Sequence, residues 1–288
     1  MNLALHNQQQ CLDQLGTAVA SLGSDAFYPA LCQAFTCFAE VSDLLFLYFP
    51  DQQRPQCLYS NLANEDQYAL QVSSYINGPY IFDPYYQASL KGAANGAYRL
   101  KDIAPDNFKK TEFFRHYYKA THVNDEVSYI TALPNNQHLH FSISHAQPSK
   151  LFSVKTLGVF YSLSHIITEL LSKHWLLQDA SSRPSNNEQP DKPNLNQALQ
   201  QALKQFGSTL LTPREHDVLQ LVLHGHSNKA AAERMSISLS TVKLHRKRIY
   251  QKLDISSQAE LFYLFIDALS SAKASDSGDP LQAYMNVS

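Results

Sequence analysis

The spacing of apolar and polar residues divides the chain into a mixed helix-and-strand region and an all-helical C-terminal region. In the first region, apolar positions recur at helical spacing over residues 3–19, 24–40, 65–76, 84–90, 106–121 and 153–177. Shorter apolar or alternating runs predict strands at 43–49, 56–60, 126–133 and 138–145. This order predicts an α/β (α+β) domain, in which one antiparallel sheet has helices packed against it.

The strand at 138–145 also predicts how that sheet is covered. Three apolar residues, Leu139, Phe141 and Ile143, alternate there with His138, His140, Ser142 and Ser144. Because successive side chains of a strand point to opposite faces, one face of the sheet is expected to be apolar and the other wet or hydrogen-bonded.

Tyrosine is concentrated in the same region, where nine of the sixteen tyrosines lie between Tyr68 and Tyr129. A tyrosine ring gives a pocket an apolar wall with a polar tip, and the nearby carboxylates of Asp83, Asp125 and Glu126 could bind an amine or quaternary ammonium group. The candidate ligand-binding residues are Tyr75, Tyr80, Phe82, Asp83, Tyr86, Phe114, Tyr118 and Glu126. The alternative is that these are ordinary core tyrosines and helix-capping acids.

Four short helices are predicted in the C-terminal region, each with a start signal. Thr212 and Glu215 form a capping box with a proline between them, and Ser227 can cap a second helix over 228–235. Ser238 can cap a third helix, and residues 257–260 form another capping box that opens a fourth. Short capped helices with a basic third member are typical of DNA-binding modules.

The third of these helices has two different faces. On a helical wheel, Ile249 and Leu253 fall within about 20° of Val242, which makes a buried seam. The opposite arc carries Ser240, Lys243, Leu244, Lys247 and Gln251. A basic run on a helix is usually only a solvated face, but three aligned caps and a short turn favour DNA binding. The outward face is then a basic ridge on a helix that fits the major groove.

The C-terminal region resembles the LuxR-type helix-turn-helix of quorum-sensing regulators and many response regulators, in the motifs LTPREHDVLQL, GHSNKAAAERM, STVKLHRKRIYQKL and SSQAEL. The resemblance implies that Lys243, Leu244 and Lys247 read bases. It also implies that six residues contact the DNA backbone: Ser227, Asn228, Lys229, Thr241, Arg246 and Lys252. Ser240, on the outward arc, is a further candidate DNA-binding residue. In that family the fourth helix carries the dimer contact, so we expect a homodimer on an inverted-repeat operator in double-stranded DNA, with RNA polymerase as a candidate further partner.

The order of elements in the first region, together with the motif FDPYYQA, resembles the GAF/PAS-like sandwich and the autoinducer-binding domain of quorum-sensing regulators. The resemblance implies a transcription regulator whose first domain senses a small intracellular ligand. An acyl-homoserine lactone is not expected, because that family has tryptophans in the pocket and the single tryptophan here is Trp175. The alternative is a ligand-independent regulator whose first domain dimerises or docks a partner protein.

An enzyme is not expected, and no cofactor is implied. His138, His140 and His145 lie on one predicted hairpin but lack a cysteine or carboxylate at metal-ligand spacing. The four cysteines all precede residue 60, fit no zinc pattern and are expected to be free thiols. A cytoplasmic location without membrane contact is expected, because the N-terminus has no secretory pattern and no apolar run approaches the ~18 residues of a membrane span.

Charge and composition assign the nucleic-acid contact to the C-terminal region. The net charge is −2, but residues 208–270 hold eight Lys/Arg against six Asp/Glu, whereas residues 1–178 hold eleven against fourteen. We expect a ligand-sensing domain at 1–178, a linker at 179–194, the helix-turn-helix domain at 195–272 and a flexible tail at 273–288. The linker is predicted to be disordered because it has three prolines and no bulky apolar residue.

Overall fold

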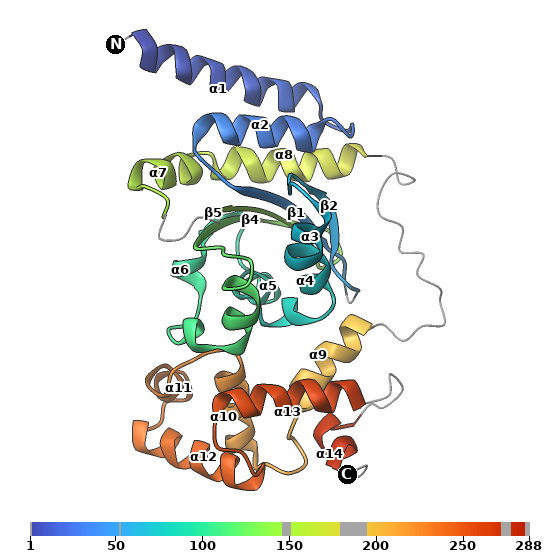
Figure 1. Ribbon diagram of the computed structural model, residues 1–288, viewed down its shortest axis with the longest axis vertical. Helices are drawn as coiled ribbons and strands as arrows, with labels where there is room; N and C mark the ends of the chain where they lie inside the picture. Colours follow the sequence, from blue (N-terminus) through green and yellow to red (C-terminus); the bar gives the residue numbers. More distant parts are fainter. Residues whose placement is uncertain (1, 52, 146–150, 179–194, 272–277, 286–288) are drawn as a thin grey trace. The chain divides into compact units, whose positions relative to one another are not determined.

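The computed structural model describes all residues except 1, 52, 146–150, 179–194, 272–277 and 286–288 (Figure 1). The chain forms two compact units. Unit 1 comprises Met1–Asn77, Pro84–Ile103 and Tyr118–Pro190, and unit 2 comprises Gly78–Asp83, Ala104–Tyr117 and Asp191–Ser288. Two short segments of the first region therefore group with the C-terminal helices. The predicted linker 179–194 lies outside the described residues, and the domain boundaries placed around it stay a prediction.

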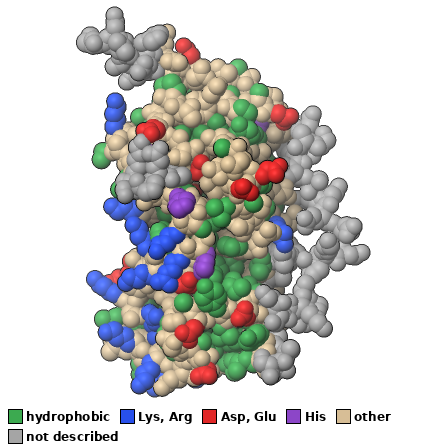
Figure 2. Space-filling model, in the orientation of Figure 1, with side chains coloured by type: hydrophobic (Ala, Val, Ile, Leu, Met, Phe, Trp, Pro, Cys, Tyr) green, Lys and Arg blue, Asp and Glu red, His purple; other side chains and the backbone are tan. Residues whose placement is uncertain are grey.

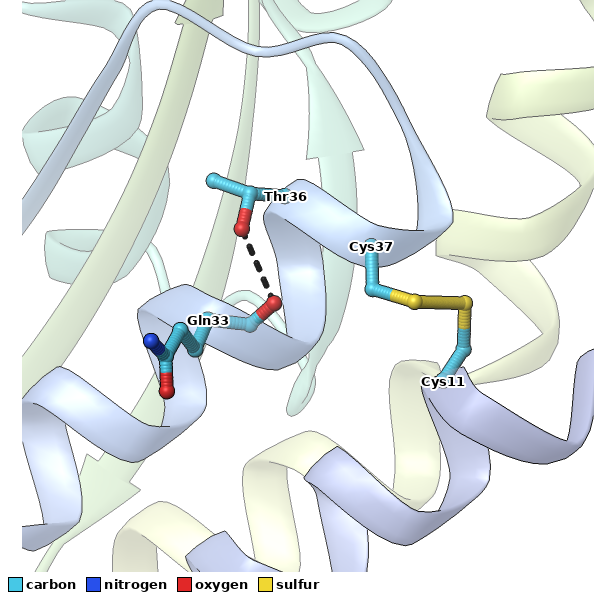
Figure 3. The surroundings of a disulfide bond; sticks show 4 residues. All are labelled: Cys11, Gln33, Thr36 and Cys37. Carbon is cyan, nitrogen blue, oxygen red and sulfur yellow. Dashed lines mark hydrogen bonds between the residues drawn. A yellow bond between two sulfur atoms is a disulfide. The ribbon is translucent and has the colours of Figure 1, made fainter. Parts of the chain in front are cut away.

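The first two helices of unit 1, α1 (Asn2–Ala20) and α2 (Phe27–Phe38), pack against each other. A disulfide joins Cys11 of α1 to Cys37 of α2, with their Cα atoms 5.3 Å apart (Figure 3). The expectation of free thiols was therefore wrong for this pair, whereas Cys32 and the remaining cysteine are free. Spacing could not reveal the pair, because only the packing of two helices brings residues 26 positions apart together.

Five antiparallel strands form the sheet of unit 1, in the order β2-β1-β5-β4-β3 (Figure 1). They are β1 (Asp43–Phe49), β2 (Gln56–Ser60), β3 (Gly96–Arg99), β4 (Asp125–Leu133) and β5 (Gln137–His145). The antiparallel sheet and four of its strands are as the sequence predicts. The edge strand β3 was missed, because its four residues follow a loop and carry no alternating pattern.

One face of the sheet forms the hydrophobic core of unit 1. Helices α2, α7 (Val154–Ser162) and α8 (Ser164–Leu177) lie over this face (Figure 1). Phe35 of α2 has its ring centroid 4.9 Å from that of Phe141 and 5.6 Å from that of Tyr129. Removing each such side chain from water contributes about 1.5–3 kcal/mol, so this face anchors the helices to the sheet.

The opposite face of the sheet is covered by short helical segments (Figure 1). These are α3 (Glu65–Tyr68), the π-helical turn η1 (Ala69–Ser73), α4 (Ser74–Ile76) and α5 (Pro84–Leu90), and the short helix α6 (Leu100–Ile103) follows β3. Helix was predicted over 65–76 and 84–90, and the structure has helical backbone there. These segments bring polar side chains onto the sheet, among them Gln71 of η1 and Ser89 of α5.

Two predicted helices differ from the structure. The segment 106–121 forms two separate helical turns, η3 (Phe108–Lys110) and η4 (Phe114–Tyr118). The single helix expected over 153–177 is the pair α7 and α8, which are separated at Leu163. Apolar spacing identifies a buried side but not an unbroken ladder of backbone hydrogen bonds, so it joined elements that the structure separates.

Unit 2 is helical. It contains η2 (Pro79–Phe82), α9 (Leu195–Gln205), α10 (Pro213–Leu223), α11 (Asn228–Met235), α12 (Leu239–Lys252), α13 (Gln258–Ser271) and α14 (Pro280–Met285). The four helices α10 to α13 are those that the sequence predicts. Among the helices that the structure describes, none is long and apolar enough to cross a bilayer.

The last helix, α14, falls in the segment that we expected to be a flexible tail. For its described residues that expectation was wrong. The Asp279 carboxylate accepts hydrogen bonds from the backbone N–H groups of Gly207 and Thr209, both at 2.9 Å, and the Leu281 side chain is buried. The polar composition of the segment did not predict this packing, because the helix is held by only one carboxylate, Asp279, and one buried leucine, Leu281.

Candidate functional site

Helices α10, α11 and α12 begin at the side-chain caps that the sequence predicts. Thr212 and Glu215 form both halves of the capping box, at 3.4 Å and 3.0 Å. The hydroxyls of Ser227 and Ser238 each accept a hydrogen bond from the backbone N–H three residues further on. Between α11 and α12, Ser236 adopts left-handed backbone with φ 54°, which ends α11. These local signals orient α12 relative to α11.

Helix α12 has a buried seam and an exposed basic side. Val242 and Ile249 are 0% and 1% exposed, whereas Lys243, Leu244 and Lys247 are exposed. Figure 2 shows Lys and Arg side chains over the part of the molecule where α11 and α12 lie. The outward side of α12 can therefore present three side chains to a DNA groove without disturbing the packing of the helix.

Arg246 joins α11 to α12. Its guanidinium donates to Asn228 Oδ1 at 2.8 Å and to the Tyr250 hydroxyl at 2.7 Å, and it lies 5.5 Å from the centre of the Tyr250 ring. Two of the predicted backbone contacts are thus already hydrogen-bonded to each other. The pair sets a cationic group at the junction of the two helices, where a phosphate could reach it.

The hydroxyl groups at the start of α12 form one small network. Ser238 Oγ lies 2.7 Å from the hydroxyl oxygens of both Ser240 and Thr241. On α11, the exposed Lys229 lies 4.0 Å from Glu233. The first turn of α12 thus carries Ser240 and Thr241, and the exposed side of α11 carries Lys229. Both places are accessible, as contacts with DNA require.

Lys252, another predicted backbone contact, forms an ion pair in which only the carboxylate partner is buried. Its Nζ lies 2.6 Å from Glu215 Oε2, and the Glu215 side chain is 3% exposed. Burial alone would raise the pKa of Glu215, but the hydrogen bonds from Lys252 and Thr212 lower the pKa to about 2. The structure thus gives Lys252 a structural role, which connects the end of α12 to the cap of α10.

The second candidate site is the polar face of the sheet in unit 1. His140 is 2% exposed, and its Nε2 lies 2.7 Å from Ser89 Oγ on α5. Burial, with the charge of His138 as a smaller effect, lowers the pKa of His140 to about 3. The Ser142 hydroxyl donates to Ser128 Oγ at 3.1 Å. This face is therefore a buried, hydrogen-bonded surface with a neutral histidine, one of the two outcomes that the alternating pattern allowed.

Four of the predicted ligand-binding residues lie in unit 1. The Tyr118 hydroxyl donates to Glu126 Oε2 at 2.9 Å, and the Tyr86 ring stacks on Phe49 with centroids 5.3 Å apart. Tyr75 is buried at 3% exposure. The structure thus brings Tyr118 and Glu126 together beside the polar face, since the Tyr85 hydroxyl of α5 also donates to the Glu126 carbonyl oxygen at 2.9 Å.

The other four predicted ligand-binding residues, Tyr80, Phe82, Asp83 and Phe114, lie in unit 2. The Phe82 ring lies 5.3 Å from that of Phe262 and 5.6 Å from that of Phe265, on α13. Within unit 2, Phe82 is therefore part of the packing of the helical bundle. Neither unit by itself gathers the whole predicted set.

Asp125 is an acid that sequence reasoning grouped with the aromatic residues as a possible partner for an amine. The structure pairs it with Arg99, whose Nη2 lies 2.6 Å from Asp125 Oδ2. The Phe152 backbone N–H also donates to this carboxylate at 2.9 Å. The missed strand β3 explains the error, because only its pairing with β4 brings Arg99 beside Asp125.

The polar face also holds residues that the sequence did not single out. Gln71 Nε2 donates to Asp43 Oδ2 at 3.0 Å, and both side chains are buried. Ser89 holds His140, as described above. The sequence held only part of the signal for these residues. The even positions of β5 predicted a polar face, but the side chains that bond to it come from helical segments that are distant in sequence.

Comparison with known proteins decides the family. Residues 209–265 match the bacterial regulatory proteins of the luxR family. Over 198 residues the chain is 30% identical to an HTH-type transcriptional regulator of the exeN 3' region in Aeromonas salmonicida, an alignment that covers 69% of this chain and 100% of that protein. The chain belongs to the luxR family of bacterial regulatory proteins.

Two further proteins are each similar to a part of this luxR-family protein. It is 44% identical over 61 residues to the transcriptional regulatory protein MctR of Rhizobium johnstonii, covering 21% of this chain and 28% of that protein. It is also similar to the crystal structure of the VqsR LBD domain from Pseudomonas aeruginosa, with a TM-score of 0.50 and 28% identity, over 58% of this chain and 97% of that one.

The luxR-family protein is thus a transcription regulator that binds DNA through its helix-turn-helix, and it is not an enzyme. Its N-terminal fold is similar to that of the VqsR LBD domain. The GAF/PAS-like part of the predicted resemblance stays a prediction.

Proposed function

We propose that this luxR-family regulator reads an inverted-repeat operator as a homodimer through α12, and that unit 1 adjusts this activity in response to a small molecule. The observation that carries the DNA half is the exposed arc Lys243, Leu244 and Lys247 above the buried seam of α12. Because the proposed target is double-stranded DNA, we propose that the protein acts in the cytoplasm, with RNA polymerase as a further partner of the DNA-bound dimer.

The DNA half is tested with single variants of the outward lysines. Lys243→Ala and Lys247→Ala should each weaken binding to an operator selected from random duplexes by about 1–3 kcal/mol, if each lysine contacts a base edge. The matched control is Lys204→Ala, an exposed lysine on α9 in the same unit. Fluorescence anisotropy at one salt concentration measures all three affinities. If the α12 variants behave as Lys204→Ala does, base reading by these lysines is refuted.

Two observations support the ligand half. The N-terminal fold is similar to the VqsR LBD domain, and the interior sheet face carries paired polar groups beside aliphatic side chains such as Leu47 and Ile130. The ligand-binding residues that we propose in unit 1 are Tyr75, Tyr86, Tyr118 and Glu126. Asp43 and Asp125 are already bonded to Gln71 and Arg99, so the proposal of an amine-bearing ligand depends on Glu126.

A thermal-shift screen of the whole chain tests the ligand half. A ligand that binds only the native state raises the melting temperature, so amine-bearing metabolites should do so and their neutral analogues should not. Glu126→Gln should abolish the shift, whereas Glu169→Gln, at an exposed acid of α8, should leave it intact. If no compound shifts the transition and the chain still dimerises, the alternative holds, in which unit 1 serves dimerisation or partner docking.

A further inference from the structure

An acidic side chain already occupies the start of α11. Asp106 Oδ1 accepts a hydrogen bond from the Ser227 backbone N–H at 2.9 Å, and Asp106 Oδ2 accepts one from the Ser227 hydroxyl. Both residues belong to unit 2, although Asp106 is 121 residues earlier in the chain. Partial burial alone would raise the pKa of Asp106, but the bonds from Ser227 and the nearby His226 lower it, so the carboxylate is ionised at neutral pH.

The segment that carries Asp106, Ala104–Tyr117, is seated closely on the turn before α11. The Asn107 backbone N–H donates to the Gly225 carbonyl oxygen at 3.1 Å. A Cβ at Gly225 would lie 2.6 Å from Thr111 Cγ2 and 3.4 Å from the Phe108 Cα, so the segment approaches where only glycine leaves room. The contact is thus made by backbone and side chains together, and does not depend on one exposed hydrogen bond.

The geometry at Ser227 is also the geometry of a phosphate contact. One N–H and one O–H of the same residue bind two oxygens of a single anion, at the positive end of a helix dipole. Two non-bridging oxygens of a DNA phosphodiester carry the same charge and offer the same pair of acceptors. The Asp106 carboxylate and a phosphate cannot both accept these two hydrogen bonds.

We propose that the segment Ala104–Tyr117 is an intramolecular competitor of the DNA backbone, with Asp106 in the place of the phosphate that Ser227 would bind. The proposal rests on the DNA-binding half of the proposed function and on the backbone contact that the family resemblance implies for Ser227. The segment is continuous in sequence with unit 1 at both ends, at Ile103 and Tyr118. Tyr118 is bonded to Glu126, so a ligand that moves this pair acts directly on the end of the competing segment.

The test measures binding of the full chain to a mixed-sequence duplex, because a backbone contact carries no sequence information. Asp106→Asn keeps the size of the side chain and removes its charge, and it should tighten binding roughly three- to tenfold, as expected when a mostly occupied competing state is removed. Asp106→Ala should give at least as large a gain. The matched control is Asp217→Asn, which makes the same charge change at an exposed acid of α10. Asp217 Oδ2 lies 3.8 Å from Arg214 Nη1.

A double-mutant cycle with Ser227→Ala separates competition from a general charge effect. The gain from Asp106→Asn should shrink in the Ser227→Ala background, because the hydroxyl for which the two anions compete is gone. Circular dichroism checks that α11 survives loss of its cap. An equal gain in both backgrounds, or equal gains from Asp106→Asn and Asp217→Asn, overturns the proposal and leaves the proposed function intact. Failure of every variant to bind any duplex refutes DNA binding, and this inference with it.

Discussion

The ion pair between Lys252 and Glu215 gives the sharpest test of how α10 and α12 are held together. Lys252→Met keeps most of the apolar stem and removes the ammonium group. Glu215 then remains as a 3% exposed carboxylate that has lost the cation 2.6 Å away. We expect unit 2 to lose stability, because a buried charge without its partner keeps its desolvation cost and loses the compensating attraction.

The pKa of Glu215 sets the magnitude and the pH window. A fall from the usual 4.5 to about 2 corresponds to about 3 kcal/mol if converted in full. Lys252 is 40% exposed, so solvent screening reduces the expected loss to roughly 1–2 kcal/mol. Because the folded-state pKa is depressed, this stability is fully present above pH 4.5 and is lost as the pH falls towards about 2. The variant should show a weaker acid dependence, because only the Thr212 hydrogen bonds then lower the pKa of Glu215.

Hydrogen exchange of the α10 and α12 amides, followed by mass spectrometry on the whole chain, measures the loss in unit 2 alone. Exchange should accelerate in Lys252→Met at neutral pH, and the two proteins should converge in acid. DNA affinity should fall by no more than the exposed-lysine control Lys204→Ala. Unchanged exchange together with a tenfold or greater loss of DNA affinity would refute the structural role and make Lys252 a direct phosphate contact.

Two further predictions concern unit 1. Because burial lowers the pKa of His140 to about 3 from the usual 6.5, the unfolded chain takes up the proton first. The free energy of unfolding of the sheet should therefore fall by roughly 1 kcal/mol per pH unit below about pH 6.5. Hydrogen exchange of the β5 amides, corrected for the intrinsic exchange rates, should show this loss as faster exchange. His140→Gln should reduce this slope, to which His174 also contributes because burial lowers its pKa to about 4. An unchanged slope in the variant contradicts a buried neutral His140. Cys37→Ser opens a loop of 26 residues and should destabilise the packing of α1 by about 3 kcal/mol. Reduced wild-type protein should match the variant, and identical α1 exchange in all samples would show that the disulfide does not hold the helix.

The DNA-binding region was predictable because its signals are local. The caps at Thr212, Ser227 and Ser238 act within three residues, and the two faces of α12 follow from a single helical period. What the sequence could not separate is which cations face DNA. Lys247 and Lys252 look alike on the basic helix, but only the fold sets Lys252 against Glu215.

The candidate ligand residues were less predictable, because their partners are distant in sequence. Clustering along the chain grouped Phe82 with Tyr118, yet Phe82 packs on α13 in unit 2 and Tyr118 bonds Glu126 in unit 1. Proximity in sequence extends over a few residues only, so it cannot assign neighbours across two interleaved units.

The sequence by itself determined the elements, the four capped helices with one basic arc, and the apolar and polar faces of the sheet, because each follows from a period or a cap spanning a few residues. The tertiary structure decided the pairing of Cys11 with Cys37, the neutral state of His140 under α5, and the contact of Asp106 with Ser227. Each of these joins residues whose separation in the chain exceeds the reach of any local pattern. Their chemistry follows from burial and from the neighbour that the fold supplies.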